Sequence, residues 1–352
     1  MKHAAAIRRA LLRWFRRDAR DLPWRRTDDP YKIWLSEVML QQTRVEQGLP
    51  YYERFVAAFP TVRDLAAASD SQVMKLWEGL GYYTRARNLH EAAKRIVHDY
   101  GGQLPRQAEL LRLLPGVGRY TAAAIASIAF GERAAVLDGN VKRVLSRLFN
   151  VSACIDETET ANELWRMAEN LVSPRNPGDF NQALMELGAR ICTPKNPRCE
   201  ECPVASYCEA HALGVETSRP VRKPKKTPPH HEVVVAAIRK NGRYLIGKRP
   251  PGGLLGGLWE FPGGKVRPGE THEQALRREC REELGIAIRT GGLVACVKHA
   301  YTHFRVTLNV YRCTQSGGEV HAKTHTEFAW VLPSQFAGYA FPKGNHKFLE
   351  FL

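Results

Sequence analysis

From Ile7 to Lys226, apolar residues recur with the three- and four-residue spacing of amphipathic helices. Proline, glycine or an Asp-Ser pair separates successive segments, and each segment has about the length of a helix in a globular protein. The pattern therefore predicts an all-α domain. Its expected helices include residues 7–15, 45–59, 62–67, 72–80, 84–99 and 108–114.

After residue 231 the pattern changes to short apolar runs that are typical of strands. Residues 233–239 and 244–247 flank Asn241-Gly242, and an Asn-Gly pair between two apolar runs is a strong signal for a hairpin turn. This part of the chain is predicted to form a smaller α+β domain. Further strands are expected at 293–298, 304–313 and 327–332, with one helix at 272–283.

Glycine, proline and lysine follow one another closely between Leu213 and His231. Such a composition cannot continue a helix, and we interpret residues 213–230 as an extended basic linker. The linker divides the multidomain chain into a helical domain at 1–212 and a second domain at 231–352.

The 352-residue chain has the 44% hydrophobic content of a globular protein and a formal net charge of +16. Both predicted domains have an excess of lysine and arginine. This excess indicates an acidic partner, although charge that only keeps the surface soluble would give the same total. Residues 1–20 form an expected arginine-rich amphipathic helix, and neither a signal peptide nor a membrane span is recognisable. We expect a cytoplasmic protein that does not bind membranes.

Gly116 and Gly118 flank Val117 ahead of an alanine-rich helix expected at 121–130. This arrangement permits a tight turn whose amides point outward at the positive end of a helix, where a DNA phosphate can bind. Asp138 follows about one helix and one turn later, close to the same site. The alternative is an ordinary turn between helices, with Asp138 as the cap of a helix at 141–149.

Glu37 is a carboxylate inside an apolar segment that begins at Tyr31. Burial would raise its pKa by disfavouring the charged form, which suits a general acid near neutral pH. The alternative is a glutamate on the surface of a helix. Gln41, Gln42 and Thr43 follow directly, and their side chains are able to bond base edges or to fill a gap in a base stack.

Four of the eight cysteines, Cys192, Cys199, Cys202 and Cys208, lie within 17 consecutive positions. Four thiolates in one short loop can surround a single metal centre, either Zn²⁺ or an iron-sulfur cluster. Disulfide pairing is the alternative, and the expected reducing location disfavours it.

Together these motifs resemble the helix-hairpin-helix base-excision glycosylases of the endonuclease III superfamily. The resemblance rests on the Leu114-Pro-Gly-Val-Gly118 turn, the Leu137-Asp-Gly-Asn-Val141 block and the cysteine spacing. Within that superfamily, Leu22-Pro-Trp-Arg25 and Ser36-Glu-Val-Met-Leu-Gln-Gln-Thr43 are similar to the adenine DNA glycosylases, which remove adenine mispaired with 8-oxoguanine. The resemblance implies that the four cysteines hold a [4Fe-4S] cluster.

The resemblance also implies base flipping, because adenine must leave the duplex before its glycosidic bond can be reached. Glu37 would protonate N7 of adenine, and an ionised Asp138 would stabilise the oxocarbenium-like sugar, with a transient covalent adduct as one form of that stabilisation. Tyr120 and Asn140 complete the implied catalytic site. The implied DNA contacts are Trp24, Arg25, Gln42, Thr43, Gly116, Gly118, Thr302 and His303. For Gln42, a wedge in the stack vacated by adenine and a plain amide at a helix N-terminus are both open.

Members of the superfamily that also cleave the strand have a lysine at the position of Tyr120, since an amine is needed to form a Schiff base with the sugar. Arg119 cannot replace that amine because its guanidinium stays protonated. The tyrosine predicts a monofunctional glycosylase that leaves an abasic site. An endonuclease III-like enzyme for oxidised pyrimidines would need the lysine.

The stretch from Gly264 to Ile286 resembles a Nudix box at every charged and glycine position, and only Cys280 departs from it. Its carboxylates Glu279, Glu282 and Glu283 are expected on one helix face, where they are candidates for binding a divalent cation such as Mg²⁺. The resemblance implies that this Nudix-like domain recognises 8-oxoguanine, as it does in adenine glycosylases. Here Tyr301-Thr302-His303 resembles the Phe-Ser-His loop that contacts this lesion.

We therefore expect a monomer that binds duplex DNA containing A:8-oxoguanine or A:G mispairs. The second domain has three open hypotheses: a lesion reader without hydrolysis, an inactive metal site, or a hydrolase of 8-oxo-dGTP. An alternative from a different class of function is a hydrolase of free nucleotides, in which the helical domain only binds DNA or metal. It predicts that turnover depends on Glu282 and not on Glu37.

Overall fold

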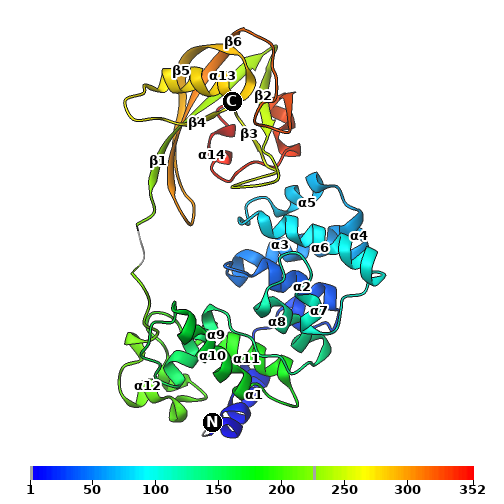
Figure 1. Cartoon of the computed structure of the whole chain (residues 1–352), viewed down its shortest axis with the longest axis vertical. Coiled ribbons are helices and arrows are strands. Elements are labelled where there is room, and N and C mark those ends of the chain that lie inside the picture. The colour runs from blue at the N-terminus through cyan, green and yellow to red at the C-terminus, as the bar shows by residue number, and fades with distance from the viewer. Residues whose placement is uncertain (1–2, 225–226) are drawn as a thin grey trace. The chain divides into compact units, whose positions relative to one another are not determined.

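The computed structural model describes residues 3–224 and 227–352, and the chain divides into two compact units (Figure 1). Unit 1 comprises Met1–Ala67 and Glu91–Lys225, and unit 2 comprises Ala68–His90 and Lys226–Leu352. Residues 1 and 2 of the predicted N-terminal helix and residues 225 and 226 of the predicted linker lie outside the described residues.

Unit 1 is helical, which confirms the predicted all-α character of this part of the chain. The helix α6 (Thr84–Tyr100) begins in unit 2 and ends in unit 1. The other helices of unit 1 are α1 (Ala4–Asp18), α2 (Pro30–Met39), α3 (Val45–Ala58), α4 (Val62–Ala67), α7 (Ala108–Leu111), α8 (Arg119–Phe130), α9 (Gly139–Leu148), α10 (Thr158–Leu171), α11 (Pro177–Arg190) and α12 (Glu209–Ala212). None of the described helices is long and apolar enough to cross a membrane.

The main core of unit 1 lies between α1, α8, α9, α10 and α11. Leu11, Ala124, Leu145, Leu164 and Leu187 each contribute a side chain that is almost completely buried. The small residues of α8 let these helices approach closely, and residues 121–127 of this helix are all buried. The first turns of α8 and α9 are thereby held on a rigid base.

Unit 2 contains a seven-stranded sheet, and the α+β character expected of this part of the chain is confirmed. Along the sheet the strands are ordered β3-β2-β1-β6-β5, with β4 paired to β1 and β7 paired to β2. β1 and β6 are parallel, and the other pairs are antiparallel. The strands are β1 (His230–Lys240), β2 (Arg243–Lys248), β3 (Trp259–Glu260), β4 (Gly263–Lys265), β5 (Ala287–Ala300), β6 (Arg305–Gly317) and β7 (Glu327–Val331).

Local sequence explains the predicted hairpin and helix of unit 2. Asn241 and Gly242 both have positive φ, at 49° and 76°, as the tight turn between β1 and β2 requires. The helix α13 (His272–Leu284) begins at a capping box on Thr271 and ends at Gly285 in the left-handed conformation. One face of α13, including Leu276 and Cys280, is buried in a cluster with residues of β1.

A short helical segment, α5 (Asp70–Trp77) with the loop that follows it, packs in unit 2 with the C-terminal residues. The Glu78 carboxylate accepts hydrogen bonds from the backbone N–H of Phe341 at 2.6 Å and from Nε2 of His346 at 2.9 Å. His346 is the first residue of the short helix α14 (His346–Leu349). The Tyr82 hydroxyl lies 2.8 Å from Oγ1 of Thr302. Charged and polar contacts thus connect residues far apart in the sequence.

Candidate active site, iron-sulfur loop and Nudix box

Glu37 lies in the last turn of α2, a helix that is capped by Asp29 and begins with a proline. Its side chain is not on the surface, because only 9% of the residue is exposed. The hydroxyl of Tyr120, from the first turn of α8, donates a hydrogen bond of 2.7 Å to Glu37. Burial raises the pKa of Glu37 to about 7. The negative charge of Asp138 also raises it, whereas the hydrogen bond from Tyr120 lowers it. Glu37 is therefore poised to exchange a proton near neutral pH.

Asp138 is the N-cap of α9, as the alternative interpretation expected, and it also faces the same cavity as Glu37. Its carboxylate accepts hydrogen bonds from Val141 N–H at 2.7 Å and from the Asn140 amide at 3.0 Å. Burial raises the pKa of Asp138, and these hydrogen bonds oppose that rise. The capping role and the position at the cavity are compatible, since one carboxylate serves both.

The cavity that contains both carboxylates has a volume of about 480 Å³ and is lined entirely by residues of unit 1. Tyr120, Asn140, Trp24, Arg25 and Thr43 also line it. A proton donor and a second carboxylate in one cavity are the two groups that acid-assisted cleavage of a glycosidic bond requires.

Glu186 forms a wall of this cavity that the sequence analysis did not identify. Arg20 and Arg25 each donate to its carboxylate, with nitrogen to oxygen distances of 2.8 and 2.9 Å. Burial disfavours the charge of Glu186, but the two arginines outweigh it and lower its pKa to about 2. Arg25, an implied DNA contact, is therefore held in an ion pair, and Trp24 is buried with its ring against Tyr52.

Arg143 connects the active-site side of α9 to the cysteine loop, and it too was missed in the sequence. Its guanidinium donates to Oδ1 of Asn140 at 2.8 Å, to the Gly188 carbonyl at 2.6 Å and to the Cys192 carbonyl at 2.7 Å. Asn140 in turn donates to Asp138. A buried arginine three residues after an Asn gives no distinctive sequence signal, because surface helices carry arginine at such positions as well.

The glycine turn between α7 and α8 has the geometry expected of an anion seat. Gly116 has a φ of 74°, and Gly118 is the N-cap of α8 without any side-chain cap. A Cβ added at Gly118 would meet no atom within 4 Å, and Gly116, Gly118 and Arg119 are exposed, so an anion could approach this end of α8. Helix α8 begins at Arg119, two residues earlier than expected.

Gln42 lies in the turn between α2 and α3, outside any helix, with a positive φ of 56° and an exposed side chain. The interpretation as an amide at a helix N-terminus is wrong, because α3 begins only at Val45. Thr43 is half-buried beside it, with its hydroxyl 3.4 Å from the Gln41 carbonyl.

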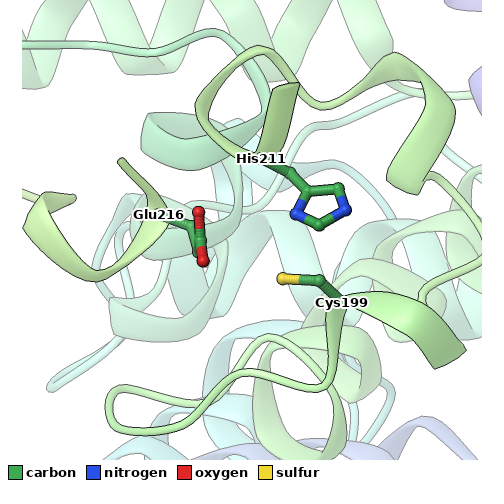
Figure 2. Close-up of side chains that lie close together, drawn as sticks. All are labelled: Cys199, His211 and Glu216. Carbon is green, nitrogen blue, oxygen red and sulfur yellow. The ribbon is translucent and has the colours of Figure 1, made fainter. Parts of the chain in front are cut away.

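The four cysteines predicted to bind metal line one pocket with Arg147 and His211. Among the described residues no single-ion group contains all four thiols, and only Cys199 lies within such a group, with His211 and Glu216 (Figure 2). A set of thiols that surround one pocket without meeting at one point fits a cluster of several atoms better than a single ion. The buried Arg147 holds the loop through the Thr193 carbonyl at 2.8 Å.

In the Nudix box, Arg278 forms ion pairs with two of the three candidate carboxylates. It lies 2.7 Å from Glu279 and 3.2 Å from Glu282, and it also pairs with Glu270 at 2.7 Å. Glu283 has a different environment and accepts a hydrogen bond from Gly263 N–H at 3.1 Å. Glu279 and Glu282 thus share Arg278 as a partner, whereas Glu283 does not pair with it.

The loop predicted to read the lesion is the tip of the hairpin between β5 and β6. Thr302 and His303 are exposed there, and the rings of Tyr301 and Phe304 stack beneath them at 4.7 Å. The Tyr82 hydroxyl at 2.8 Å from Thr302 adds a residue that the sequence analysis did not single out.

A basic hollow of about 790 Å³ adjoins this loop in unit 2. Its lining includes Lys298, Arg305, Lys347, His230 and His299, with one carboxylate at Glu232. The excess of cationic side chains makes the hollow attractive to phosphate groups.

Comparison with known proteins identifies the family. Three family models match: the HhH-GPD superfamily of base excision DNA repair proteins over residues 35–170, the iron-sulfur binding domain of endonuclease III over 192–208 and the NUDIX domain over 233–351. Adenine DNA glycosylase of Rattus norvegicus is 38% identical over 389 residues, which cover 95% of this chain and 75% of that protein. The chain belongs to the adenine DNA glycosylase family. The family resemblance expected from the motifs is thereby confirmed.

Other adenine DNA glycosylases and solved structures agree with this assignment. The adenine DNA glycosylase of Buchnera aphidicola subsp. Acyrthosiphon pisum is 34% identical, covering 85% of this chain and 84% of that protein. A thermostable thymine-DNA glycosylase matches with a TM-score of 0.55 and 34% identity, over 60% of this chain and 98% of that one. An endonuclease III–DNA complex, at 23% identity and a TM-score of 0.51, shares the fold over 61% of this chain and 99% of that one. The cysteine loop of this family member is an iron-sulfur binding loop, which decides against zinc and against disulfides.

Proposed function

We propose that this member of the adenine DNA glycosylase family hydrolyses the N-glycosidic bond of adenine mispaired with 8-oxoguanine or guanine in duplex DNA. The observation that carries the proposal is Glu37, whose pKa is raised to about 7 beside Asp138 in one cavity. Relatives named adenine DNA glycosylase support adenine as the base.

In the proposed reaction, adenine flips out of the duplex into the cavity. Glu37 gives its proton to N7, and the bond between C1′ and N9 breaks with its electron pair leaving on the base. Asp138, ionised and held by Val141 and Asn140, stabilises the positive sugar until water adds at C1′ and gives its proton to the Glu37 carboxylate, which restores the acid. Tyr120 positions the Glu37 carboxyl through their hydrogen bond.

We propose that the enzyme is monofunctional and leaves an abasic site. Tyr120 stands where an amine would be needed for a Schiff base, and a phenol cannot supply one. This residue argues against an endonuclease III-like activity on oxidised pyrimidines.

For DNA binding, we propose that the amides after Gly118 hold a backbone phosphate and that exposed Gln42 fills the gap left by the flipped adenine. Thr302 and His303 at the hairpin tip would contact 8-oxoguanine. We propose that one copy of the chain binds the DNA as a monomer.

Cys192, Cys199, Cys202 and Cys208 would hold the iron-sulfur cluster as a [4Fe-4S] centre. When bound, the cluster ties together a loop of irregular structure that Arg147 and Arg143 anchor to α9. Mg²⁺ at Glu279, Glu282 and Glu283 stays a prediction, and the ion pairs of Arg278 offer it no support.

The test gives the purified protein, in Mg²⁺ buffer, a duplex with adenine opposite 8-oxoguanine, the same duplex with guanine, and free 8-oxo-dGTP. We expect adenine release from both duplexes, without strand nicking or nucleotide hydrolysis. Glu37→Gln should abolish release while DNA binding persists, whereas Glu53→Gln, at an exposed carboxylate of α3 that does not line the cavity, should leave release unchanged. Adenine release that survives Glu37→Gln would refute the mechanism, and nucleotide hydrolysis alone would refute the function.

A further inference from the structure

Three side chains converge in unit 2 outside the proposed glycosylase site. Glu260 ends β3, Glu283 lies in the last turn of α13, and His325 precedes β7. Each offers a ligand atom, and these atoms all lie within 4.8 Å of one another. Only Glu283 belongs to the Nudix box, so the group is distinct from the set of three box carboxylates.

The imidazole of His325 is fixed in place from both sides. The backbone N–H of Lys323 donates to the Glu283 carbonyl at 3.0 Å, and that of Thr326 donates to the Lys248 carbonyl at 2.9 Å. Only 2% of the His325 side chain is exposed, and its Nε2 lies 3.1 Å from Oε1 of Glu260. The ring is therefore pre-positioned rather than mobile.

Gly247 makes room for this ring. A Cβ added at Gly247 in β2 would come within 2.7 Å of the His325 ring, closer than such atoms approach in proteins. Because φ at Gly247 is not in the left-handed region, the glycine is not required by the backbone. Because Gly247 has no side chain, the imidazole of His325 has the space to reach the two carboxylates.

The two carboxylates of the group have different partners. Nη1 of Arg249 lies 2.7 Å from each oxygen of Glu260 and offsets that carboxylate. Glu283 has no ion pair within the part of the chain that the structure describes, and its one hydrogen-bond donor there is Gly263 N–H. Glu283 is therefore a half-buried carboxylate of the group without a salt bridge among the described residues, and a bound cation would pair with it.

The ligand types indicate which cation fits. Imidazole nitrogen with carboxylate oxygen is a ligand set of Zn²⁺, whereas Mg²⁺ prefers oxygen ligands throughout. Three protein ligands would leave a fourth position for water. Arg249 would orient the Glu260 carboxylate from outside, as groups hydrogen-bonded to metal ligands commonly do.

We propose that Glu260, Glu283 and His325 form a binding site for one divalent cation of the zinc class. This site goes beyond the proposed glycosylase function and does not depend on it. The site also differs from the cation site predicted at the Nudix box, because two of its three ligands lie outside the box and Glu279 and Glu282 are paired with Arg278 instead.

The test is equilibrium dialysis of the full-length protein, with its iron content measured, against Zn²⁺ alone. We expect one Zn²⁺ per chain in addition to the iron. His325→Gln and Glu283→Gln should each weaken binding by about 10-fold or more. Glu279→Gln and Glu282→Gln are the matched controls on the same helix, and they should bind Zn²⁺ as the wild type does.

Two further measurements keep the proposal falsifiable if a ligand variant fails to fold. Gly247→Ala, which changes no ligand, should weaken Zn²⁺ binding while iron content and far-UV circular dichroism stay unchanged. X-ray absorption at the zinc edge should show nitrogen and oxygen neighbours at about 2.0–2.2 Å and no sulfur. Sulfur neighbours would place the ion in the cysteine loop. Equal losses of Zn²⁺ binding in the Glu279 and Glu282 variants would place the ion at the Nudix box. Either result, or the absence of bound Zn²⁺, would overturn the proposal.

Discussion

Replacing Glu37 by glutamine should stabilise the folded protein above neutral pH while it abolishes the proposed chemistry. The pKa of Glu37 is about 7 in the folded protein, against an ordinary value of 4.5. Each pKa unit corresponds to about 1.4 kcal/mol, so keeping an ionised Glu37 folded costs about 3 kcal/mol. The amide of the E37Q variant is neutral at every pH and can still accept the hydrogen bond from Tyr120.

The direction of this pH dependence follows from which state, folded or unfolded, binds the proton. Between the ordinary pKa and the folded-state pKa, the folded protein retains a proton that the unfolded chain has lost, so stability falls as pH rises through this window. Below the ordinary value both states are protonated, and above about 7 the full cost is present. Wild type and E37Q should therefore unfold alike near about pH 4 and differ by about 3 kcal/mol near about pH 8.

Urea unfolding at both pH values, followed by tryptophan fluorescence, measures this difference. The chain has two units, so the comparison uses the transition of unit 1, which contains Trp24 and Trp34. The Glu53→Gln variant, at an exposed position of α3, is the control and should unfold as the wild type does at both pH values. An E37Q variant with the wild-type midpoint at both pH values would show that Glu37 titrates normally and would refute its role as an acid near neutral pH.

Three other substitutions test the second carboxylate, the link from α9 to the cysteine loop and the basic hollow of unit 2. Asp138→Asn should slow adenine release by orders of magnitude in single-turnover assays, and an unchanged rate would remove Asp138 from the mechanism. In Arg143→Lys, one ammonium on a shorter side chain replaces a planar guanidinium whose Nε and Nη2 reach acceptors in different directions, so iron content and excision rate should fall together; full iron content would contradict the connection through Arg143. Lys298→Ala in the basic hollow should reduce the slope of log affinity against log salt by about 1, and an unaltered slope would exclude a phosphate contact there.

One substitution tests the packing of α5 in unit 2. Glu78→Gln weakens the hydrogen bonds to Phe341 and His346, so the loop with Tyr82 should lose its fixed position beside Thr302. The expected result is a smaller ratio of excision rates for 8-oxoguanine over guanine opposite adenine. A preserved ratio would show that this packing does not contribute to lesion discrimination.

Local patterns were sufficient for most elements of the fold. The turn at Asn241-Gly242 and the helix α13 follow from residues that are adjacent in the sequence, and both were predicted. The strands β3 and β4 were not, since they are two and three residues long and lie among glycines and prolines. Their strand character comes from pairing with β2 and β1, which no local pattern reports.

The candidate site was only partly accessible to sequence reasoning, for a related reason. Glu37 and Asp138 could be selected from their motifs, but their partners come from distant segments. Glu186 reads as an ordinary helical glutamate until Arg20 and Arg25 meet it from more than a hundred residues away. Likewise, nothing near Glu78 indicates that its partner is Phe341.

The opposite roles proposed for the two carboxylates are consistent with where each lies on its helix. Glu37 is two residues from the end of α2, where the partial negative charge of the helix disfavours an ionised carboxylate. Asp138 caps the start of α9, where the partial positive charge and the Val141 amide favour one. Both line one cavity, but Glu37 is buried and Asp138 is only half-buried, so burial favours a proton on Glu37 more than on Asp138. The helix ends act in the same direction, which fits the proposed roles of Glu37 as the proton donor and Asp138 as the ionised carboxylate.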